Sequence, residues 1–273
     1  MDLFTIDQEK CNQDGICAAV CPVAVIDFKK GQFPRPLANA AELCLGCGHC
    51  VAVCPTAALD HVQSPLADCQ PLPDKGDLGL EQIKYLLCGR RSIRCFKDRQ
   101  VPKEVLRQLL EIAFYAPSGH NSQPFDWLIY QDRDELHRLA GLVVDWMRMV
   151  MDKNPAMAQT MHLDAVIALW DQGIDRILRD TPSLVVAYAD KSNIYAPPAG
   201  AIAISYLETS AFGLGLGACW AGYFNRAAQD FPPLVEALGL PQGKVTFGAL
   251  MVGYPRFSYK RLPVRKTPQV DWR

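Results

Sequence analysis

The sequence predicts an α+β protein built from two domains. A cysteine-rich segment occupies the first 63 residues, and a stretch rich in proline, glycine and aspartate follows it at residues 64–80. Beyond this stretch, helical patterns of apolar residues alternate with short apolar runs of strand length. We therefore expect a small domain over residues 1–63, a linker over 64–80 and a larger α+β domain over 81–273.

Composition narrows the class of protein. Of the 273 residues, 49% are hydrophobic and 21% are charged, which is typical of a soluble globular protein. The net charge of −1 gives no basic field that would favour nucleic acid or an anionic membrane as a partner. The first ten residues lack the charged and apolar regions of a signal peptide. The long apolar stretch at 199–224 contains Glu208 and several glycines, which favours a buried helix and strand over a membrane span.

The cysteines are the most informative residues. Residues 44–55 read CLGCGHCVAVCP, with the spacing C-x2-C-x2-C-x3-C-P. Three thiolates on one tight loop suit three corners of an iron–sulfur cluster. A zinc ribbon would usually pair two C-x2-C units at a longer separation, so zinc fits less well. Seven of the eleven cysteines have ligand spacing, and this usage favours a reducing, cytoplasmic compartment.

The cysteine stretch is repeated. Shifted by 33 residues, the segment from Cys11 to Pro22 superimposes on the segment from Cys44 to Pro55. Asp14 is the exception, because it stands where Cys47 stands in the second copy. A repeat of this kind predicts two similar half-units related by a pseudo-two-fold axis.

Residues 1–63 resemble a bacterial-type ferredoxin with two [4Fe–4S] clusters. In that family the fourth cysteine of each half ligates the cluster of the other half. The resemblance implies one cluster on Cys21, Cys44, Cys47 and Cys50, and a second on Cys11, Cys17 and Cys54 with Asp14 at the remaining corner. Because a carboxylate is a harder ligand than a thiolate, this corner is either held by Asp14 or empty in a three-iron cluster. The alternative is that Asp14 only makes the turn before Gly15.

Residues 81–273 carry a series of ordered motifs. Arg90, Arg91, Ser92 and Arg94 lie within five residues and form a candidate anion cradle, since guanidinium groups fit phosphate oxygens. The motifs follow one another as RRSIRCF at 90–96, APSGHNSQP at 116–124, an aromatic strand at 127–130, GLGLGACWAGYF at 213–224, Gly-Tyr-Pro at 253–255 and a basic tail at 265–268.

This order of motifs resembles the FMN-dependent nitroreductase family. The family's fold is a central, mostly antiparallel sheet surrounded by helices, so we expect that architecture for residues 81–273. The resemblance implies that the FMN phosphate and ribityl chain contact Arg90, Arg91 and Ser92, and that Arg265 or Lys266 completes the phosphate site. It also implies that Arg94 lies near the N1/O2 edge of the ring, where a cation stabilises reduced flavin.

The remaining flavin contacts are implied by two further motifs. In the resembled family the loop after the first long helix comes from the other subunit and lines the ring. That motif supplies Pro117, Ser118, Gly119, Asn121 and Gln123. The motif at 213–224 supplies backbone groups near N5 of the ring, at Trp220, Ala221 and Gly222. No catalytic side chain is named, because the cofactor carries the chemistry.

Two helical regions affect assembly and specificity. Residues 199–214 form a helix that is apolar on nearly all sides, which predicts complete burial. In the resembled family this helix forms the centre of a homodimer. Residues 133–180 are expected to be helical with a break at Asn154-Pro155, and they hold five of the seven methionines. These methionines either fill the core or form a lid over the flavin.

Two functions are consistent with these features. In the first, the protein is an enzyme: clusters pass electrons from a low-potential donor to FMN, which reduces a small nitroaromatic, quinone or enone-like substrate. In the second, it is an electron-transfer module that serves a protein partner. An open pocket over the flavin favours the enzyme, and a pocket filled by side chains favours the carrier.

Overall fold

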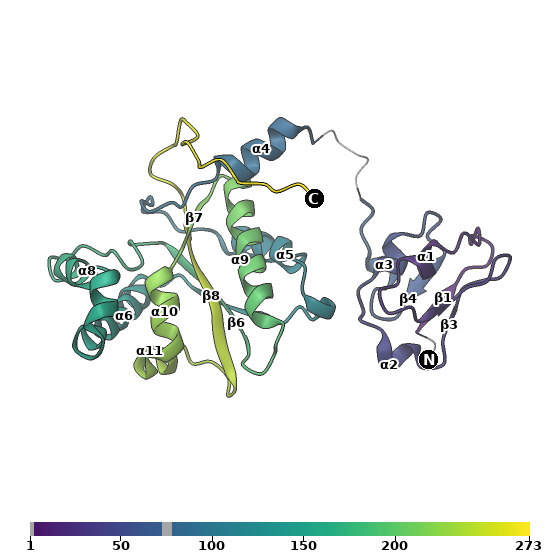
Figure 1. Cartoon of the computed structure of the whole chain (residues 1–273), viewed down its shortest axis with the longest axis horizontal. Helices are drawn as coiled ribbons and strands as arrows, with labels where there is room; N and C mark the ends of the chain where they lie inside the picture. The colour runs from purple at the N-terminus through teal and green to yellow at the C-terminus, as the bar shows by residue number, and fades with distance from the viewer. Residues whose placement is uncertain (1–2, 73–77) are drawn as a thin grey trace. The chain divides into compact units, whose positions relative to one another are not determined.

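The computed structural model describes residues 3–72 and 78–273. It divides into two compact units, one comprising residues 1–77 and 119–122, the other comprising 78–118 and 123–273 (Figure 1). Within the described residues, no helix is both long and apolar enough to span a bilayer.

The first unit contains two short antiparallel sheets. Strand β1 (Phe4–Ile6) pairs with β4 (Leu59–His61), and β2 (Ile26–Asp27) pairs with β3 (Arg35–Pro36). Short helices join them: α1 (Ile16–Ala19), α2 (Ala40–Leu43), α3 (His49–Ala52) and the 3-10 helix η1 (Leu66–Asp68). A small apolar core around Phe4, Val51 and Leu59 holds these elements together.

The sequence repeat appears as repeated geometry. Gly15 precedes α1 with φ 73°, and Gly48 precedes α3 with φ 69°. Both angles lie in the left-handed region, which glycine enters without the steric cost of a Cβ atom. At Gly15 a Cβ would also lie 2.3 Å from the Phe28 ring. The two halves therefore need glycine at the same point, just before the short helix that carries one cysteine, Cys17 in α1 and Cys50 in α3.

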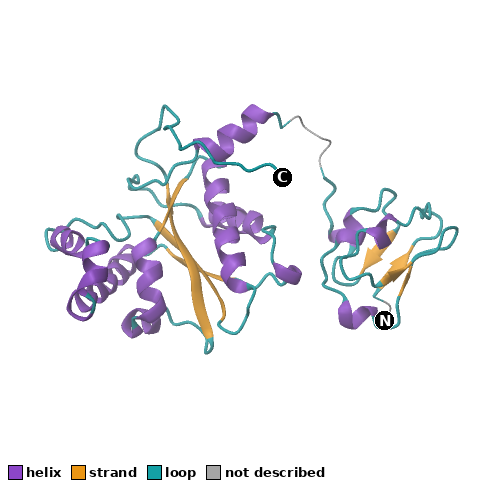
Figure 2. Ribbon diagram, in the orientation of Figure 1, coloured by secondary structure: helices purple, strands orange, loops and turns teal. Residues whose placement is uncertain are grey.

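The second unit is organised around a four-stranded sheet. Its strand order is β5 (Asp126–Tyr130), β6 (Ser183–Asp190), β8 (Lys244–Gly253) and β7 (Gly217–Trp220), and every neighbouring pair is antiparallel. Figure 2 shows this sheet with helices on both sides. The predicted α+β fold with an antiparallel sheet surrounded by helices is confirmed.

Two cores form because side chains on a strand alternate between faces. Leu184 and Val186 of β6 belong to one core, whereas Val185 and Ala187 belong to the other. Helices α5 (Lys103–Phe114) and α9 (Ala196–Gly213) cover one face, and α6 (Arg133–Lys153), α10 (Gly222–Asp230) and α11 (Pro232–Ala237) cover the other (Figure 1). The remaining helices are α4 (Leu80–Gly89), α7 (Pro155–Thr160) and α8 (Leu163–Trp170).

The apolar sequence of helix α9 predicted burial on every side. Within the single chain, this helix is buried on one side only. Ala203, Ile204 and Leu207 are buried against the sheet. On the opposite face, Ile202 and Tyr206 are 36% and 40% exposed. One face of the helix thus remains open to an additional partner, although its side chains are largely apolar.

Four of the five methionines in the methionine-rich region belong to or pack against the core, whereas Met151 is exposed. Met147 is completely buried, and Met149, Met157 and Met161 pack against the same core. The helices end at Trp170, so the expectation of helix up to residue 180 is wrong for the last ten residues. There the Asp175 carboxylate accepts the backbone N–H groups of Ile177, Leu178 and Asp180. Side-chain bonds of this kind compete with helix formation.

Candidate functional site

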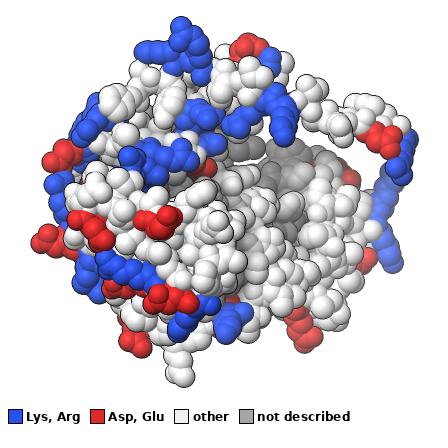
Figure 3. All heavy atoms as spheres, turned by 60° about the vertical axis from the view of Figure 1, so that its left-hand side comes forward, with Lys and Arg blue, Asp and Glu red and all other residues white. Residues whose placement is uncertain are grey.

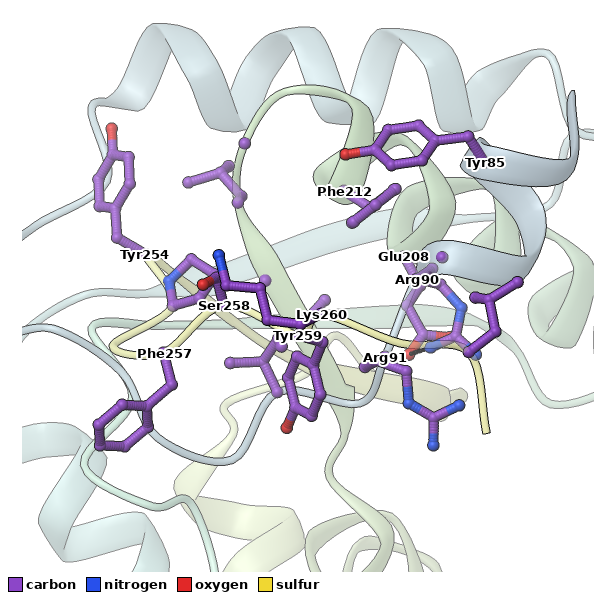
Figure 4. A pocket seen from close by; sticks show the side chains of 18 of the residues that line it. Tyr85, Arg90, Arg91, Glu208, Phe212, Tyr254, Phe257, Ser258, Tyr259 and Lys260 are labelled. Carbon is purple, nitrogen blue, oxygen red and sulfur yellow. Dashed lines mark hydrogen bonds and ion pairs between the residues drawn. The ribbon is translucent and has the colours of Figure 1, made fainter. Parts of the chain in front are cut away.

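The second unit contains a cavity with a volume of about 830 Å³. It lies where the end of α4 and the residues after it meet α9, β7 and the chain beyond β8. Figure 4 shows Arg90, Glu208, Tyr85 and Phe212 at one end of it, and Tyr254 and Phe257 at the other. This volume falls within the range of about 300–1,000 Å³ that is typical of ligand and cofactor sites.

The lining of this cavity is both basic and aromatic. Seven basic residues face two acidic ones, Glu81 and Glu208. The basic residues are Lys84, Arg90, Arg91, Lys97, Arg256, Lys260 and Arg261. Five aromatic residues also line it: Tyr85, Phe212, Tyr254, Phe257 and Tyr259. Basic side chains also gather over the upper part of the face shown in Figure 3. Such a lining suits an anionic ligand that carries an aromatic ring.

Arg90 is held in place by a carboxylate from a distant helix. Its Nη1 donates to Glu208 Oε1 at 2.8 Å. Glu208 is only 8% exposed, and burial raises its pKa, a shift that the Arg90 guanidinium opposes only in part. A guanidinium has five N–H donors, so this contact leaves others for a ligand. Sequence reasoning recorded Glu208 only as an interruption of an apolar stretch.

Ser92 and Arg94 lie beside β7 and outside the lining of the cavity. Ser92 forms a parallel bridge with Ala218, and the Ile93 N–H donates to the Ala218 carbonyl at 2.8 Å. Burial raises the pKa of the neighbouring Cys219 thiol, whereas Arg94 and Arg179 oppose this shift. Arg179 was missed from the sequence, because it lies in the region expected to be helical and no local motif marks it.

The residues of the APSGHNSQP loop lie in two separate environments. Pro117, Ser118 and Gln123 line a small hollow between α5 and α9, and the Gln123 N–H donates to Ser118 Oγ at 3.0 Å. Gly119 and Asn121 belong to the 3-10 helix η2 (Gly119–Asn121), which is grouped with the first unit. None of these five residues lines the large cavity.

The last two groups of predicted flavin contacts also lie outside that lining. Trp220 is partly exposed at the end of β7, Ala221 is buried, and Gly222 begins α10. Arg265 and Lys266 are exposed. The chain supplies Arg256, Lys260 and Arg261 to the cavity instead, from the segment just before the predicted tail. The positive charge of these three residues was the sequence feature that could have identified them as phosphate contacts.

In the first unit, four cysteines line one cavity. They are Cys21 from the first half of the repeat and Cys44, Cys47 and Cys50 from the second. This grouping is the one that the crossed ligand pattern implies. Burial raises the pKa of Cys50 to about 11. Four sulfur donors gathered from both halves of the repeat suit a soft iron–sulfur cluster.

The second set of predicted ligands is mixed in burial, since Cys17 is buried while Cys11 and Cys54 are partly buried. Burial raises the pKa of the Cys17 thiol, and the nearby Asp14 and Cys11 add to the shift. Asp14 is exposed, and its Oδ1 accepts the N–H of Ile16 at 3.0 Å, which is the turn expected of an aspartate before glycine. Cys54 Sγ accepts the N–H of Ala58 at 3.2 Å. Within the described part of the chain, no three histidine, cysteine or acidic side chains are arranged to hold a single metal ion.

Comparison with known proteins identifies the larger unit. The model of the nitroreductase family matches residues 87–254. The chain belongs to the nitroreductase family. Ahead of this nitroreductase domain, the model of a 4Fe-4S dicluster domain matches residues 9–58. The predicted fusion of a two-cluster ferredoxin domain with a nitroreductase domain is thereby confirmed, and the protein is an oxidoreductase.

Individual relatives match mainly the nitroreductase domain. A proposed NADH dehydrogenase/NAD(P)H nitroreductase of Archaeoglobus fulgidus is 25% identical over 179 residues, covering 65% of this chain and 87% of that protein. An iodotyrosine deiodinase of Thermotoga neapolitana is 27% identical over 176 residues, covering 64% of this chain and 90% of that protein. The fold is shared with an FMN-bound nitroreductase of Bacteroides fragilis, at a TM-score of 0.55 and 22% identity over 72% of this chain and all of that one.

Proposed function

We propose that the protein binds FMN in the large cavity of its nitroreductase domain and two iron–sulfur clusters in its dicluster domain. With electrons from a low-potential donor, it reduces a small aromatic or conjugated substrate of the nitroaromatic, quinone or enone class. The observation that supports this most strongly is an open cavity whose walls combine arginine, lysine and aromatic side chains.

The residues of the cavity fit FMN chemically. Arg91, Lys260 and Arg261 bring cations that suit the phosphate group. Tyr85, Phe212 and Tyr259 bring aromatic surface that suits stacking. When bound, FMN supplies the redox chemistry, and the protein contributes binding, orientation and charge.

The paired side chains of Arg90 and Glu208 have a separate task in this proposal. Their hydrogen bond of 2.8 Å fixes one edge of the Arg90 guanidinium, so that its other N–H groups have a defined direction. The aromatic residues around the cavity exclude water from the bound ring. Arg94 and Arg179 add positive charge near Cys219 of β7.

For the clusters, we propose the ligand sets that the repeat implies. One cluster is held by Cys21, Cys44, Cys47 and Cys50, which line one cavity. The other is held by Cys11, Cys17 and Cys54, with Asp14 at or near the fourth corner. The sulfur-rich, partly buried donor set favours iron–sulfide over a hard cation.

An enzyme is favoured over an electron carrier for a protein partner by the names of the relatives, which are a nitroreductase and a deiodinase. The cavity does not separate the two functions, since FMN occupies it in both. Among the described residues, no methionine lines the cavity: Met147, Met149, Met157 and Met161 lie in or against the core, and Met151 is exposed. The names of the relatives extend the candidate substrates to halogenated aromatic rings.

We also propose a homodimer formed through α4 and α9. Leu80 and Leu87 of α4 are 64% and 57% exposed, and Ile202 and Tyr206 of α9 form the exposed face described above. Light scattering should give twice the mass of one chain for the wild type and for Ile174→Glu, an exposed apolar site elsewhere. Tyr206→Glu should favour the single chain. A wild-type monomer that retains flavin would refute the dimer.

Substrate class is tested by turnover without oxygen. Reconstituted full-length protein, supplied with a chemical low-potential donor, is given a nitroaromatic, a quinone, an enone and a halogenated phenol. The proposal expects product from at least one of them, and loss of that product in Arg91→Ala. If flavin-loaded protein reduces none of the four but reduces a redox protein, the carrier function is the correct one.

A further inference from the structure

The two halves of the dicluster domain differ at one buried position that faces the cysteines. His61 ends β4, is 3% exposed, and lines the same cavity as Cys44 and Cys47. Its Nε2 lies 3.5 Å from Cys44 Sγ. The turn after β4 is closed by the backbone, since the carbonyl of His61 accepts the Ser64 N–H at 3.0 Å.

The hydrogen bonds of His61 determine which nitrogen carries the proton. The backbone N–H of Gln63 donates to Nδ1 at 3.1 Å, so Nδ1 must have a free lone pair. A neutral imidazole has one N–H, and it must then be on Nε2. The contact with Cys44 is therefore an N–H···S hydrogen bond with the imidazole as donor. The Gly46 N–H donates to the same sulfur at 3.4 Å.

The equivalent position in the first half cannot make this bond. The repeat shift of 33 residues that relates Cys11 to Cys44 also relates Phe28 to His61. The Phe28 ring lies against Gly15, at the point where a Cβ would approach within 2.3 Å. Phenylalanine has no N–H to offer a sulfur, so the donor belongs to one half only.

We propose that His61 donates its Nε2–H to the thiolate of Cys44 and thereby raises the reduction potential of the cluster held by Cys21, Cys44, Cys47 and Cys50. Reduction adds negative charge to the cluster and its sulfurs, and a hydrogen bond to a sulfur stabilises that charge. The cluster of the other half, which has Phe28 and Asp14 at the corresponding places, lacks this stabilisation. His61 is a positioning and tuning residue in this account, and it ligates no iron.

This inference rests on the cluster ligands proposed above. Its test is a potential titration of full-length, reconstituted protein followed by electron paramagnetic resonance, with the iron content measured in each sample. His61→Leu removes the donor, His61→Gln retains a side-chain N–H, and Phe28→Leu alters the matched position of the other half. An iron content too low for two clusters per wild-type chain would show that the proposed ligand sets are wrong, independently of His61.

We expect His61→Leu to make one cluster about tenfold harder to reduce, which corresponds to about 59 mV for one electron. His61→Gln should restore much of that loss, and Phe28→Leu should leave the potential of the cluster that His61→Leu shifts unchanged. Two unchanged potentials in His61→Leu with full iron content would overturn the inference, and so would an equal shift in His61→Gln.

The His61 variants could fail to hold their clusters, so a second measurement leaves position 61 unchanged. Pulsed magnetic resonance of reduced protein labelled at histidine nitrogen should detect coupling of one imidazole to a cluster. His49 is a second histidine close to the ligands, since its Nδ1 lies 3.2 Å from the Cys47 carbonyl oxygen. The coupling should persist in His49→Gln, and its absence there would contradict the inference.

Discussion

The side chains of Arg90 and Glu208 meet at 2.8 Å although 118 residues separate them in the sequence. The contact joins the C-terminal end of α4 to the buried side of α9, at one end of the large cavity. A partly buried ion pair of this kind orients the guanidinium, but the burial of its carboxylate also has a cost. The ion pair stabilises the folded protein, whereas burial of the carboxylate destabilises it. Stability measured as a function of pH shows which effect is larger.

The Glu208→Gln variant should gain folding stability relative to the wild type as the pH rises above 4.5, the ordinary pKa of a glutamate side chain. Burial raises the pKa of Glu208 in the folded protein, so the folded state binds more protons than the unfolded chain between the two pKa values. Wild-type stability contributed by this group is therefore lost as the pH rises through that range. Gln still accepts from Arg90 but cannot ionise.

Calorimetry of the full-length protein measures this difference as a melting temperature, at about 2–4 °C per kcal/mol for a unit of this size. A variant whose melting temperature falls relative to the wild type as the pH rises would show that the charged pair outweighs the burial of the carboxylate.

Arg91→Ala should weaken FMN binding by about 10- to 150-fold, because a charge-assisted hydrogen bond contributes about 1.5–3 kcal/mol. Arg91 lines the cavity, and its side chain is labelled in Figure 4. Arg107→Ala is the matched control, since Arg107 is exposed on α5 and pairs with Glu104. Flavin fluorescence during dilution gives both affinities. Equal affinities in the two variants would place the phosphate elsewhere.

Gly15→Ala should destabilise the dicluster domain more than Gly31→Ala. Both glycines have left-handed backbones, with φ +73° and +80°, so both variants carry a strain of about 1–2 kcal/mol. Only at Gly15 does the new Cβ meet a side chain, the Phe28 ring, whereas nothing lies within 4 Å at Gly31. Urea-induced loss of the clusters compares the two. Equal midpoints would mean that the Phe28 ring moves aside freely.

The Asp14 half of the repeat should lose an iron readily on oxidation. An oxygen donor binds a soft iron–sulfide corner less tightly than a thiolate does. Asp14 already accepts the Ile16 N–H with one oxygen, which weakens it further as a ligand. We expect a three-iron resonance signal in air-exposed wild type and its suppression in Asp14→Cys. Two intact four-iron clusters in both wild type and Asp14→Ala would show that Asp14 only shapes the turn.

The extent to which the sequence predicted this molecule depends on how local each feature is. The cysteine spacing and the 33-residue repeat lie within short segments, and the ferredoxin resemblance that they carry implied the grouping of Cys21 with Cys44, Cys47 and Cys50. The antiparallel sheet was expected from the order of motifs. The pairing of Arg90 with Glu208 depends on how α4 packs against α9, which no local pattern encodes.

Other features were ambiguous for a similar reason. A methionine on a helix has the same sequence signature whether it faces a core or a ligand, and Met147 faces the core. The apolar pattern of α9 predicted that the helix is buried, but it did not show which elements cover it. The exposure of Tyr206 shows that the single chain leaves one face of the helix uncovered. The segment that brings Arg256 and Lys260 to the cavity has no regular structure and hence no periodicity to recognise.

The most direct test of the account is a single anaerobic reoxidation. Full-length protein is reduced completely, freed of reductant and mixed with a nitroaromatic, while flavin and cluster absorbance are followed together. We predict that the flavin is reoxidised and that the clusters follow, with reduced product matching the electrons released. Flavin and clusters that stay reduced in the presence of excess nitroaromatic would contradict the account.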